Sequence, residues 1–414
     1  MLKRFTVSRR EDRPTNPPLK LISSSLTEVG NQRIYSRSIS WNASGSYLAM
    51  GSSDRMTRLW TVQDAASSTA AREIVTIAGH GGNVDRVRFH PVQDSLLATA
   101  SGGDGTVRLW DIRGATSKAV GKLDLSQTSP TPSSQSASTT PITKEKGGAN
   151  TIQGGVVDIA WSTKPGILAV TDRNGSVHVI DTRKLSAAQA FSVPHCGGSK
   201  TTKSISRFSR NSPVLKSFSL RPSFVDACIF SPSTNCLVAA TSNDGYGEIT
   251  VWNWEETDTL TVDEDSDPNK MNTSLKFVYP AHTGPIYSMG FSSDGKRLAT
   301  GAGDAVVGLW DVSSMACTAT MIRCSRFIRS VSFSHDSRLI AVSTEDDVVD
   351  IGMSDTGMFV GNVPLSGGRS RTGGGPAGAD EIAFHPKYLL LACARCDSVV
   401  HPPLTIVKLK TEAI

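Results

Sequence analysis

The sequence predicts an all-β fold, a seven-bladed β-propeller, and three observations lead to this prediction. Short apolar stretches recur along the 414 residues, each rich in β-branched residues and bounded by Gly, Asp, Asn or Ser, a pattern typical of half-buried strands. Two groups of these stretches begin with Gly-His or Ala-His and end with Trp-Asp. The groups number seven along the chain, so we expect each group to form one four-stranded blade.

Two of the seven units are complete copies of the pattern. The second unit runs from His80 to Trp110, and the fifth unit runs from His282 to Trp310. The other units are identified by the pattern and order of their strands. The strands that close the seven units are marked by Trp60, Trp110, Ile180, Trp252, Trp310, Ile351 and a residue near Val407. This recurrence, with Gly-His at the start and Trp-Asp at the end, resembles the WD40 repeat, which implies a closed ring of blades.

Four side chains of each complete unit are expected to form one buried hydrogen-bonded group. A neutral imidazole donates from one nitrogen and accepts at the other, whereas the indole of Trp only donates, so a hydroxyl or carboxylate must lie nearby. The two expected sets are His80, Thr99, Asp104 and Trp110, and His282, Thr300, Asp304 and Trp310. The same residue types occur in catalytic triads, but catalytic groups converge at one site and do not recur with a structural repeat. We therefore expect these sets to have a structural role.

The two ends of the chain are expected to close the ring. After the last recognisable strand, Leu404–Leu409, too few residues remain for the outer strand of the seventh blade. An unpaired edge would promote aggregation, so another segment must pair there. Leu19–Ser25, upstream of the first unit, is the predicted donor. The propeller is therefore expected to span residues 19–414, behind a flexible N-terminal segment of residues 1–18.

Three insertions are expected to interrupt the ring. Residues 126–153 are rich in Ser, Thr and Pro, and residues 365–379 are rich in Gly, so both are expected to be disordered loops. Residues 195–224 hold six basic side chains and no acidic one, although the formal net charge of the whole chain is only +5. The six are Lys200, Lys203, Arg207, Arg210, Lys216 and Arg221. Contact with the backbone of RNA is one interpretation of this segment, and a solvated, phosphorylatable surface loop is the other.

The sequence predicts no catalytic, cofactor or metal site. Glycines occur at turns and not in a phosphate-binding motif, and an acidic stretch around Asp265 falls in a polar loop. Cys393 and Cys396 have the spacing of zinc ligands, but on an alternating strand such a pair is more simply explained as two packed thiols. The cysteines are scattered, and no apolar run is long enough for a membrane span or signal peptide. We therefore expect an intracellular protein that is not an enzyme and not membrane-bound.

The fifth and sixth units resemble one WD40 family in detail, that of THO complex subunit 3. The residues that carry the resemblance are the run from Thr300 to Asp311, the following segment 329–336, and the end of the sixth unit, where Asp350-Ile351 is expected in place of Trp-Asp. The resemblance implies a nuclear, non-catalytic scaffold subunit of the THO/TREX complex, which couples transcription to mRNP assembly and mRNA export. It implies large helical THO subunits as partners and, indirectly, a DEAD-box helicase and export adaptors, with the propeller itself monomeric.

The fold alone leaves another function open, because propellers host many unrelated activities. A substrate receptor of a ubiquitin ligase, or a chromatin protein that reads histone tails, would have the same architecture. Either would use the pocket at the central channel of the ring.

Overall fold

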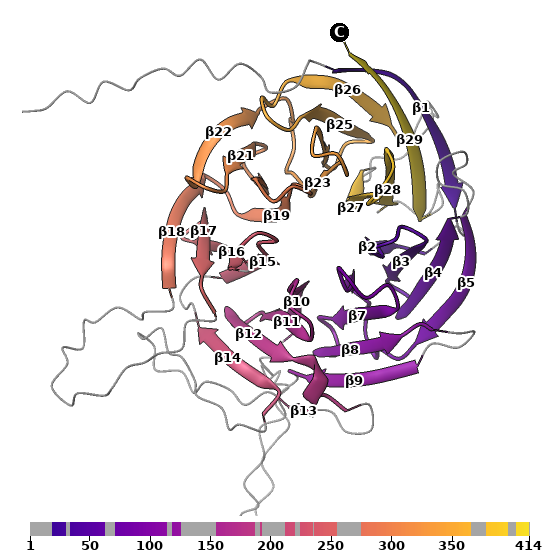
Figure 1. Cartoon of the computed structure of the whole chain (residues 1–414), viewed down its shortest axis with the longest axis vertical. Coiled ribbons are helices and arrows are strands. Elements are labelled where there is room, and N and C mark those ends of the chain that lie inside the picture. Colours follow the sequence, from indigo (N-terminus) through magenta and orange to yellow (C-terminus); the bar gives the residue numbers. More distant parts are fainter. Residues whose placement is uncertain are drawn as a thin grey trace, which may run out of the picture.

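The computed structural model is a ring of seven β-sheets, the blades of a propeller, with the strands of each blade arranged from the centre of the ring to its rim (Figure 1). The expected all-β, seven-bladed fold is confirmed. The structure describes residues 19–29, 34–62, 71–113, 118–125, 155–186, 191–192, 212–219, 224–234, 236–254, 275–365, 378–395 and 403–413. The expected segments 1–18 and 126–153, and most of 365–379, lie outside these described residues.

Each blade has four antiparallel strands. The innermost strands are β2 (Ser36–Trp41), β6 (Arg86–Phe89), β10 (Val156–Trp161), β15 (Phe224–Phe230), β19 (Ile286–Phe291), β23 (Ser330–Phe333) and β27 (Ala379–Phe384). The second strands are β3 (Tyr47–Ser52), β7 (Leu96–Ser101), β11 (Ile167–Asp172), β16 (Leu237–Asn243), β20 (Arg297–Ala302), β24 (Leu339–Ser343) and β28 (Leu390–Arg395). The third strands are β4 (Met56–Val62), β8 (Thr106–Asp111), β12 (Ser176–Asp181), β17 (Tyr246–Trp252), β21 (Val307–Asp311), β25 (Val348–Met353) and β29 (Leu404–Ala413). The outermost strands are β5 (Ala71–Ala78), β9 (Lys118–Asp124), β14 (Val214–Ser219), β18 (Leu275–His282), β22 (Ala316–Met321), β26 (Phe359–Pro364) and β1 (Leu19–Val29).

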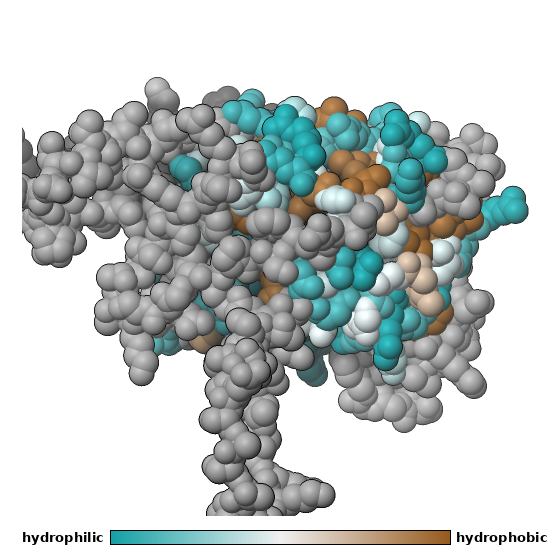
Figure 2. Space-filling model, turned by 90° about the horizontal axis from the view of Figure 1, so that it is seen from below, coloured by the Kyte–Doolittle hydropathy of each residue, from teal (hydrophilic) through white to brown (hydrophobic). Residues whose placement is uncertain are grey.

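Position in the blade explains the sequence of each strand. The second strand β11 is buried at all six positions, because it packs between two neighbouring sheets, and its residues are mostly aliphatic. The outermost strand β22 buries only its last residue, so polar residues are tolerated along it. Figure 2 views the ring edge-on and shows hydrophilic and hydrophobic side chains mixed on the side of the rim that lies at the bottom of Figure 1. The outermost strands therefore carry the weakest sequence signal.

Seven clusters of buried hydrophobic residues hold the ring together, one at each contact between adjacent blades. Between blades 1 and 2, for example, Leu59 and Ile77 of blade 1 pack with Val87 of blade 2. Between blades 7 and 1, Leu390 packs with Trp60 in the same way. Since a sheet is stable only when its apolar face is covered by another element, each blade depends on both of its neighbours.

A β-bulge near the start of the innermost strand recurs in five blades, where the pairing with the second strand shifts by one residue. The bulged residues are Arg37, Val157, Asp226, Tyr287 and Asp380. A bulge leaves one residue unpaired and re-aims its side chain. Because all innermost strands begin at the same end of the ring, the bulged residues encircle that end of the central channel, which we call the channel mouth.

The N-terminal strand closes the ring, as predicted. β1 pairs antiparallel with β29, from Leu19 opposite Ala413 to Val29 opposite Leu404, so the pairing extends beyond the expected Leu19–Ser25. The side chain of Leu19 is buried in the cluster between blades 6 and 7. The two strands lie side by side on the rim (Figure 1).

The expected third insertion, residues 195–224, is wrong at its C-terminal end. β14 lies inside that range and forms the outermost strand of blade 3, paired with β12. Without β14 the third strand of the blade would present an open edge. A short segment before it, β13 (Phe191–Ser192), pairs in parallel with β9 and gives blade 2 a fifth strand.

The end of the sixth unit also differs from the expectation. Gly352 pairs with Ile340 in the register in which Trp110 pairs with Leu97 in blade 2, so Gly352 occupies the tryptophan position. The Asp-Ile pair expected there lies two positions earlier. A Cβ atom on Gly352 would lie 2.7 Å from Cε of Met321, because the methionine packs into the space beside the glycine. With no tryptophan in the unit, the sequence had no marker for the register.

The part of the chain that the structure describes contains one short 3-10 helix, η1 (Thr182–Lys184). None of its helical segments is long and apolar enough to cross a membrane.

Candidate interaction site

Blade 2 contains a chain of hydrogen bonds that joins the four side chains of the first expected set. Trp110 Nε1 donates to Thr99 Oγ1 at 2.9 Å, and Thr99 Oγ1 lies 2.8 Å from His80 Nε2. His80 Nδ1 lies 3.1 Å from Asp104 Oδ2. Because a carboxylate only accepts and an indole only donates, His80 carries its proton on Nδ1, and Thr99 donates to Nε2. Every polar atom in this chain therefore has a partner of the correct kind.

Asp104 also ties two loops together. Its carboxylate accepts the backbone N–H groups of Gly81 at 2.7 Å and Thr106 at 2.9 Å. Burial raises the pKa of Asp104, but the hydrogen bonds from His80, Thr106 and Gly81 outweigh burial and hold the pKa well below its ordinary value. The ionised carboxylate therefore fixes the loop that leads into β6 against the turn between β7 and β8.

Blade 5 repeats this geometry with the second expected set. Trp310 Nε1 donates to Thr300 Oγ1 at 2.9 Å, and Thr300 Oγ1 lies 2.8 Å from His282 Nε2. His282 Nδ1 lies 3.0 Å from Asp304 Oδ2. A Cβ atom on Gly308 would meet both Trp310 Nε1 and Thr300 Oγ1 within 3 Å, so glycine leaves room for the indole to reach the hydroxyl. The recurrence and the burial of both histidines favour a role in folding over catalysis.

Blades 1 and 3 lack the hydroxyl that this chain requires. Met50 occupies in blade 1 the position that Thr99 holds in blade 2, and the buried Nε1 of Trp60 has no hydrogen-bond partner among the described residues. In blade 3 the corresponding positions hold Val170 and Ile180. These blades therefore depend on apolar packing at the place where blades 2 and 5 use hydrogen bonds.

Of the six basic residues expected to contact RNA, only Lys216 lies within the described residues. It is half-buried in β14, opposite Val179 of β12, and so is part of the blade and not of a loop. The other five are Lys200, Lys203, Arg207, Arg210 and Arg221, which lie outside the described residues.

The Cys-x-x-Cys segment is only partly described. Cys393 is fully buried in β28, whereas Cys396 lies outside the described residues. His385, which precedes this segment in the sequence, donates from Nε2 to the carbonyl oxygen of Gly45 at 3.1 Å. Burial lowers the pKa of His385 to about 4. This imidazole therefore joins blade 7 to a loop of blade 1.

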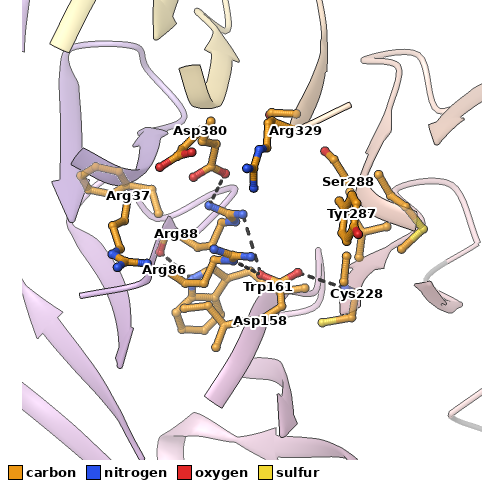
Figure 3. Close-up of a pocket in the computed structure, with 18 of the residues that line it drawn as sticks. Arg37, Arg86, Arg88, Asp158, Trp161, Cys228, Tyr287, Ser288, Arg329 and Asp380 are labelled. Carbon is orange, nitrogen blue, oxygen red and sulfur yellow. Dashed lines mark hydrogen bonds and ion pairs between the residues drawn. The ribbon is translucent and has the colours of Figure 1, made fainter. Parts of the chain in front are cut away.

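A cavity of about 250 Å³ lies in the central channel and reaches the channel mouth, and all seven innermost strands or the residues just before them contribute to its walls. Figure 3 shows side chains from opposite sides of the ring pointing into it. Seven of the lining residues are charged: Arg37, Arg86, Arg88, Asp158, Arg329, Asp380 and Glu381. None of them was among the candidate site residues expected from the sequence.

The deeper charges of the cavity form a closed network. Arg88 Nη1 pairs with Glu381 Oε1 at 2.8 Å, and Arg86 Nε pairs with Asp158 Oδ1 at 3.1 Å. Burial lowers the pKa of Arg88, but Glu381 and Asp158 outweigh burial and raise the pKa above its ordinary value. Asp158 Oδ2 also accepts the backbone N–H of Cys228 at 3.0 Å. These charges are satisfied within the ring and link blades 2, 3, 4 and 7.

The inner edges of the innermost strands form hydrogen bonds with the adjacent blades. In five of the seven junctions, a side chain accepts the backbone N–H of the innermost strand of the next blade, which would otherwise lack a partner. The pairs are Ser38 with Val87 (3.1 Å), Asp158 with Cys228 (3.0 Å), Ser288 with Val331 (3.1 Å), Ser330 with Ile382 (3.2 Å) and Glu381 with Ile39 (3.0 Å). Ser, Asp and Glu therefore occur at the centre of the ring because their side-chain oxygens accept hydrogen bonds from these backbone N–H groups.

Exposed aromatic side chains surround the channel mouth. They stand at the starts of innermost strands, or at a turn between second and third strands, which lies at the same end because the strands are antiparallel. The residues are Tyr35, Phe224, Tyr246, Tyr287 and Phe327, each between 41% and 62% exposed. Aromatic and arginine side chains dominate the binding energy of protein interfaces, so the channel mouth is the candidate docking surface.

A signal for this surface was present in the sequence. Arg86 and Arg88 stand two residues apart in an otherwise apolar strand. In the seventh unit, Glu381 stands at the position of Arg86, and Asp380 precedes it. Aligning the units by their innermost strands would have placed these charges on one ring. The sequence reasoning aligned them by their closing strands instead.

Comparisons with known proteins agree with this architecture. A family model described as "WD domain, G-beta repeat" matches residues 27–61, 71–111 and 273–311. The chain therefore contains WD40 repeats, and its seven blades form a propeller. Over 386 residues it is 26% identical to THO complex subunit 3 of Arabidopsis thaliana, covering 92% of this chain and 93% of that protein.

Two other relatives match less of their length. WD repeat-containing protein AAC3 of Dictyostelium discoideum is 24% identical over 74% of this chain, which spans 52% of that protein. Cell division cycle 20.5, cofactor of APC complex, of Arabidopsis thaliana is 35% identical over only 18% of this chain. So short a match reflects a repeat and not a shared function.

Proposed function

We propose that this protein is a non-catalytic WD40 scaffold subunit of a THO/TREX-type complex, which acts in the nucleus to couple transcription to mRNP assembly and mRNA export. The observation that carries the proposal is the extent of the similarity to THO complex subunit 3, which covers nearly the whole of both chains. A likeness of repeats alone would cover only part of one chain. In this role the propeller is a single copy held by large helical THO subunits, which in turn recruit a DEAD-box helicase and export adaptors.

The chemistry of the centre supports a scaffold over an enzyme. The thiol at the cavity wall belongs to Cys228, and burial raises its pKa well above the ordinary value, so it is a poor nucleophile. The carboxylates of Asp158 and Glu381 are engaged in ion pairs with Arg86 and Arg88, so these two carboxylates are not free to accept a proton from a substrate. A general base needs a free lone pair facing the substrate.

The test is affinity purification of the tagged protein from nuclear extract treated with RNase, followed by mass spectrometry. Two variants locate the docking surface: Phe327→Ala removes an exposed aromatic side chain at the channel mouth, and Val92→Ala removes an exposed apolar one in the loop between β6 and β7, at the opposite end. We expect large helical THO subunits with the wild type and with Val92→Ala, and reduced recovery with Phe327→Ala. Recovery of ubiquitin-ligase or histone-modifying subunits instead would overturn the proposed pathway.

We also propose that the basic residues of segment 195–224 that lie outside the described residues contact RNA. Deletion of residues 195–211, which spares β14, should weaken RNA binding at low salt and flatten its salt dependence. An unchanged affinity and salt dependence would refute this contact.

A further inference from the structure

A groove of about 790 Å³ lies between blades 4 and 5. It is bordered by the turns that follow β15, β19 and β21. These turns lie at the end of the ring opposite the channel mouth, because the innermost strands begin at the mouth and the strands of a blade are antiparallel. The apolar lining includes Val251, Phe277 and Tyr279 of blade 4 and Phe291, Val312 and Met315 of blade 5.

The outermost strand of blade 4 exposes apolar side chains on both of its faces. In β18, Phe277 is 51% exposed and the adjacent Val278 is 40% exposed, and neighbouring residues of a strand point to opposite faces. β18 is the last strand of its sheet among the described residues, so its outer edge presents backbone N–H and C=O groups. An apolar edge strand of this kind readily pairs with another chain.

The corresponding place in blade 2 is covered by the chain itself. Gly121 of β9 lies opposite Leu109, the residue before the tryptophan of that blade. Phe277 lies opposite Val251, which holds the same place in blade 4, so Gly121 and Phe277 occupy equivalent positions. A Cβ atom on Gly121 would lie 2.9 Å from Cβ of Leu185, a buried residue of the connection between β12 and β14 in blade 3. A segment of the next blade therefore packs on blade 2 at the place where blade 4 exposes Phe277.

The covering segment also bonds to the backbone edge of β9. Lys122 N donates to the carbonyl oxygen of Ser186 at 3.2 Å, and β13 then pairs with β9 as a fifth strand. Val278 holds in β18 the position of Lys122, so its N–H also points away from the third strand. Pro280, two residues later, has no N–H, which agrees with an outward direction at alternate residues. The edge of β18 therefore offers a donor at Val278.

The next blade supplies no such cover for blade 4 within the described residues. The connection that covers blade 2 spans residues 182–213, whereas the corresponding turn of blade 5 spans only residues 312–315. Asp311 closes that turn by accepting the backbone N–H of Ser314 at 2.9 Å. So short a turn cannot add a strand to β18, and the groove is the space that remains.

The polar groups of the groove favour an uncharged occupant. Its two carboxylates are already engaged. Asp294 accepts the hydroxyl of Ser292 at 2.6 Å, and Asp311 accepts the hydroxyl of Ser313 at 2.6 Å. Lys296 is exposed, so its ammonium group can stay in solvent. An apolar side chain can therefore enter the groove without displacing these hydrogen bonds.

We propose that an extended, uncharged segment of a partner protein adds a fifth strand to blade 4. Its backbone pairs with the edge of β18 at Val278, and its bulky apolar side chains, at alternating positions, fill the groove beside Phe277. Pro280 ends the edge that can pair, so the added strand is short. The inference goes beyond the proposed function and does not depend on which complex holds the protein, because it rests on the comparison of blades 2 and 4.

The test is a selection of random peptides displayed on phage against the full-length protein, after depletion on the variant Phe277→Thr. Threonine keeps the strand propensity and removes the ring. We expect the enriched peptides to carry bulky apolar residues at alternating positions. A synthetic copy of the most enriched peptide, titrated by calorimetry, should bind Phe277→Thr about tenfold more weakly than it binds the wild type.

Two variants at the next position separate backbone pairing from apolar contact. Val278→Pro removes the outward N–H and should weaken binding of the peptide by about threefold or more, whereas Val278→Thr keeps this donor and should weaken it less. Ile74→Thr is the matched control, because Ile74 is 43% exposed on β5, the outermost strand of blade 1, and does not line the groove. It should leave the affinity unchanged. Melting temperatures of all variants distinguish lost binding from lost folding.

The proposal is wrong if no peptide is enriched, if the enriched peptides lack alternating apolar residues, or if folded Val278→Pro binds as tightly as Val278→Thr. Two other results would also overturn it. Binding that requires replacement of residues 255–274 by a Gly-Ser linker would assign the groove to this chain's own segment. A wild-type dimer that Phe277→Thr dissociates, measured by sedimentation, would assign it to a second copy. Failure to co-purify THO subunits would leave the titration unaffected, so the two hypotheses fail separately.

Discussion

Removing the hydroxyl of Thr99 should destabilise the propeller, because this one oxygen serves two buried partners. Thr99 Oγ1 accepts from Trp110 Nε1 and donates to His80 Nε2, at 2.9 and 2.8 Å. Thr99→Val keeps the shape of the side chain but leaves both partners buried without a hydrogen bond. Each stranded group costs about 1–3 kcal/mol, and the added methyl returns about 0.8 kcal/mol. We expect a net loss of about 1–5 kcal/mol in the free energy of unfolding.

The control for this experiment is Thr405→Val. Thr405 is fully buried in β29, and its hydroxyl has no hydrogen-bond partner among the described residues, so valine should be neutral or stabilising there. Urea denaturation followed by tryptophan fluorescence, and calorimetry, would measure both variants. The reasoning would be refuted if the two substitutions changed the free energy of unfolding by amounts that agree within about 0.5 kcal/mol. Both threonines are buried, and only the hydroxyl of Thr99 has hydrogen-bond partners among the described residues.

Three further predictions concern pH, closure and a loop. Folding lowers the pKa of Asp104, so the ionised carboxylate adds to the free energy of unfolding above its ordinary pKa of about 4, and this stabilisation is lost as the pH falls below that value. The difference in unfolding free energy between wild type and Asp104→Asn should therefore shrink from about pH 6 to about pH 3. A difference that stays constant would show that the charge of Asp104 is not involved. Deleting residues 1–25 should lower the melting temperature and cause aggregation, because much of β29 loses its partner; light scattering equal to that of the full chain would contradict this. Gly45→Ala should cost more than 1 kcal/mol, because Gly45 has a φ of 78° and its Cβ would collide with His385; an unchanged denaturation midpoint would argue against that packing.

The sequence predicted those features that depend on a local, repeated signal. The strand count, the two hydrogen-bonded sets and the closing strand all follow from alternating apolar residues and from the markers His80 and Trp110. The outermost strand β14 was missed because three of its six residues are Lys216, Ser217 and Ser219, so its composition resembles a loop. The register of the sixth blade was missed because Gly352 stands where a tryptophan would have marked it.

The channel mouth could not be predicted in the same way, because its properties arise from residues far apart in sequence. Arg88 and Glu381 are separated by most of the chain yet pair at 2.8 Å. Asp380 makes no ion pair with the described residues, because the bulge in β27 releases it and the nearby Arg37 and Arg329 pair with other carboxylates. Aligning the innermost strands would have placed these charges on one ring, but no single residue indicates which charges pair, since charged residues in strands usually face solvent.

The pairing of β1 with β29 also sets an order of events during synthesis. β1 leaves the ribosome first, but its partner is among the last segments made, and at about 5–20 residues per second it waits roughly 20–80 s for that strand. Blades 1 to 6 are complete in sequence before then, so they can stack as an open arc with two unsatisfied ends. The final step joins segments that only the whole chain supplies, and a prematurely terminated chain would expose both ends of the arc to chaperones and proteases.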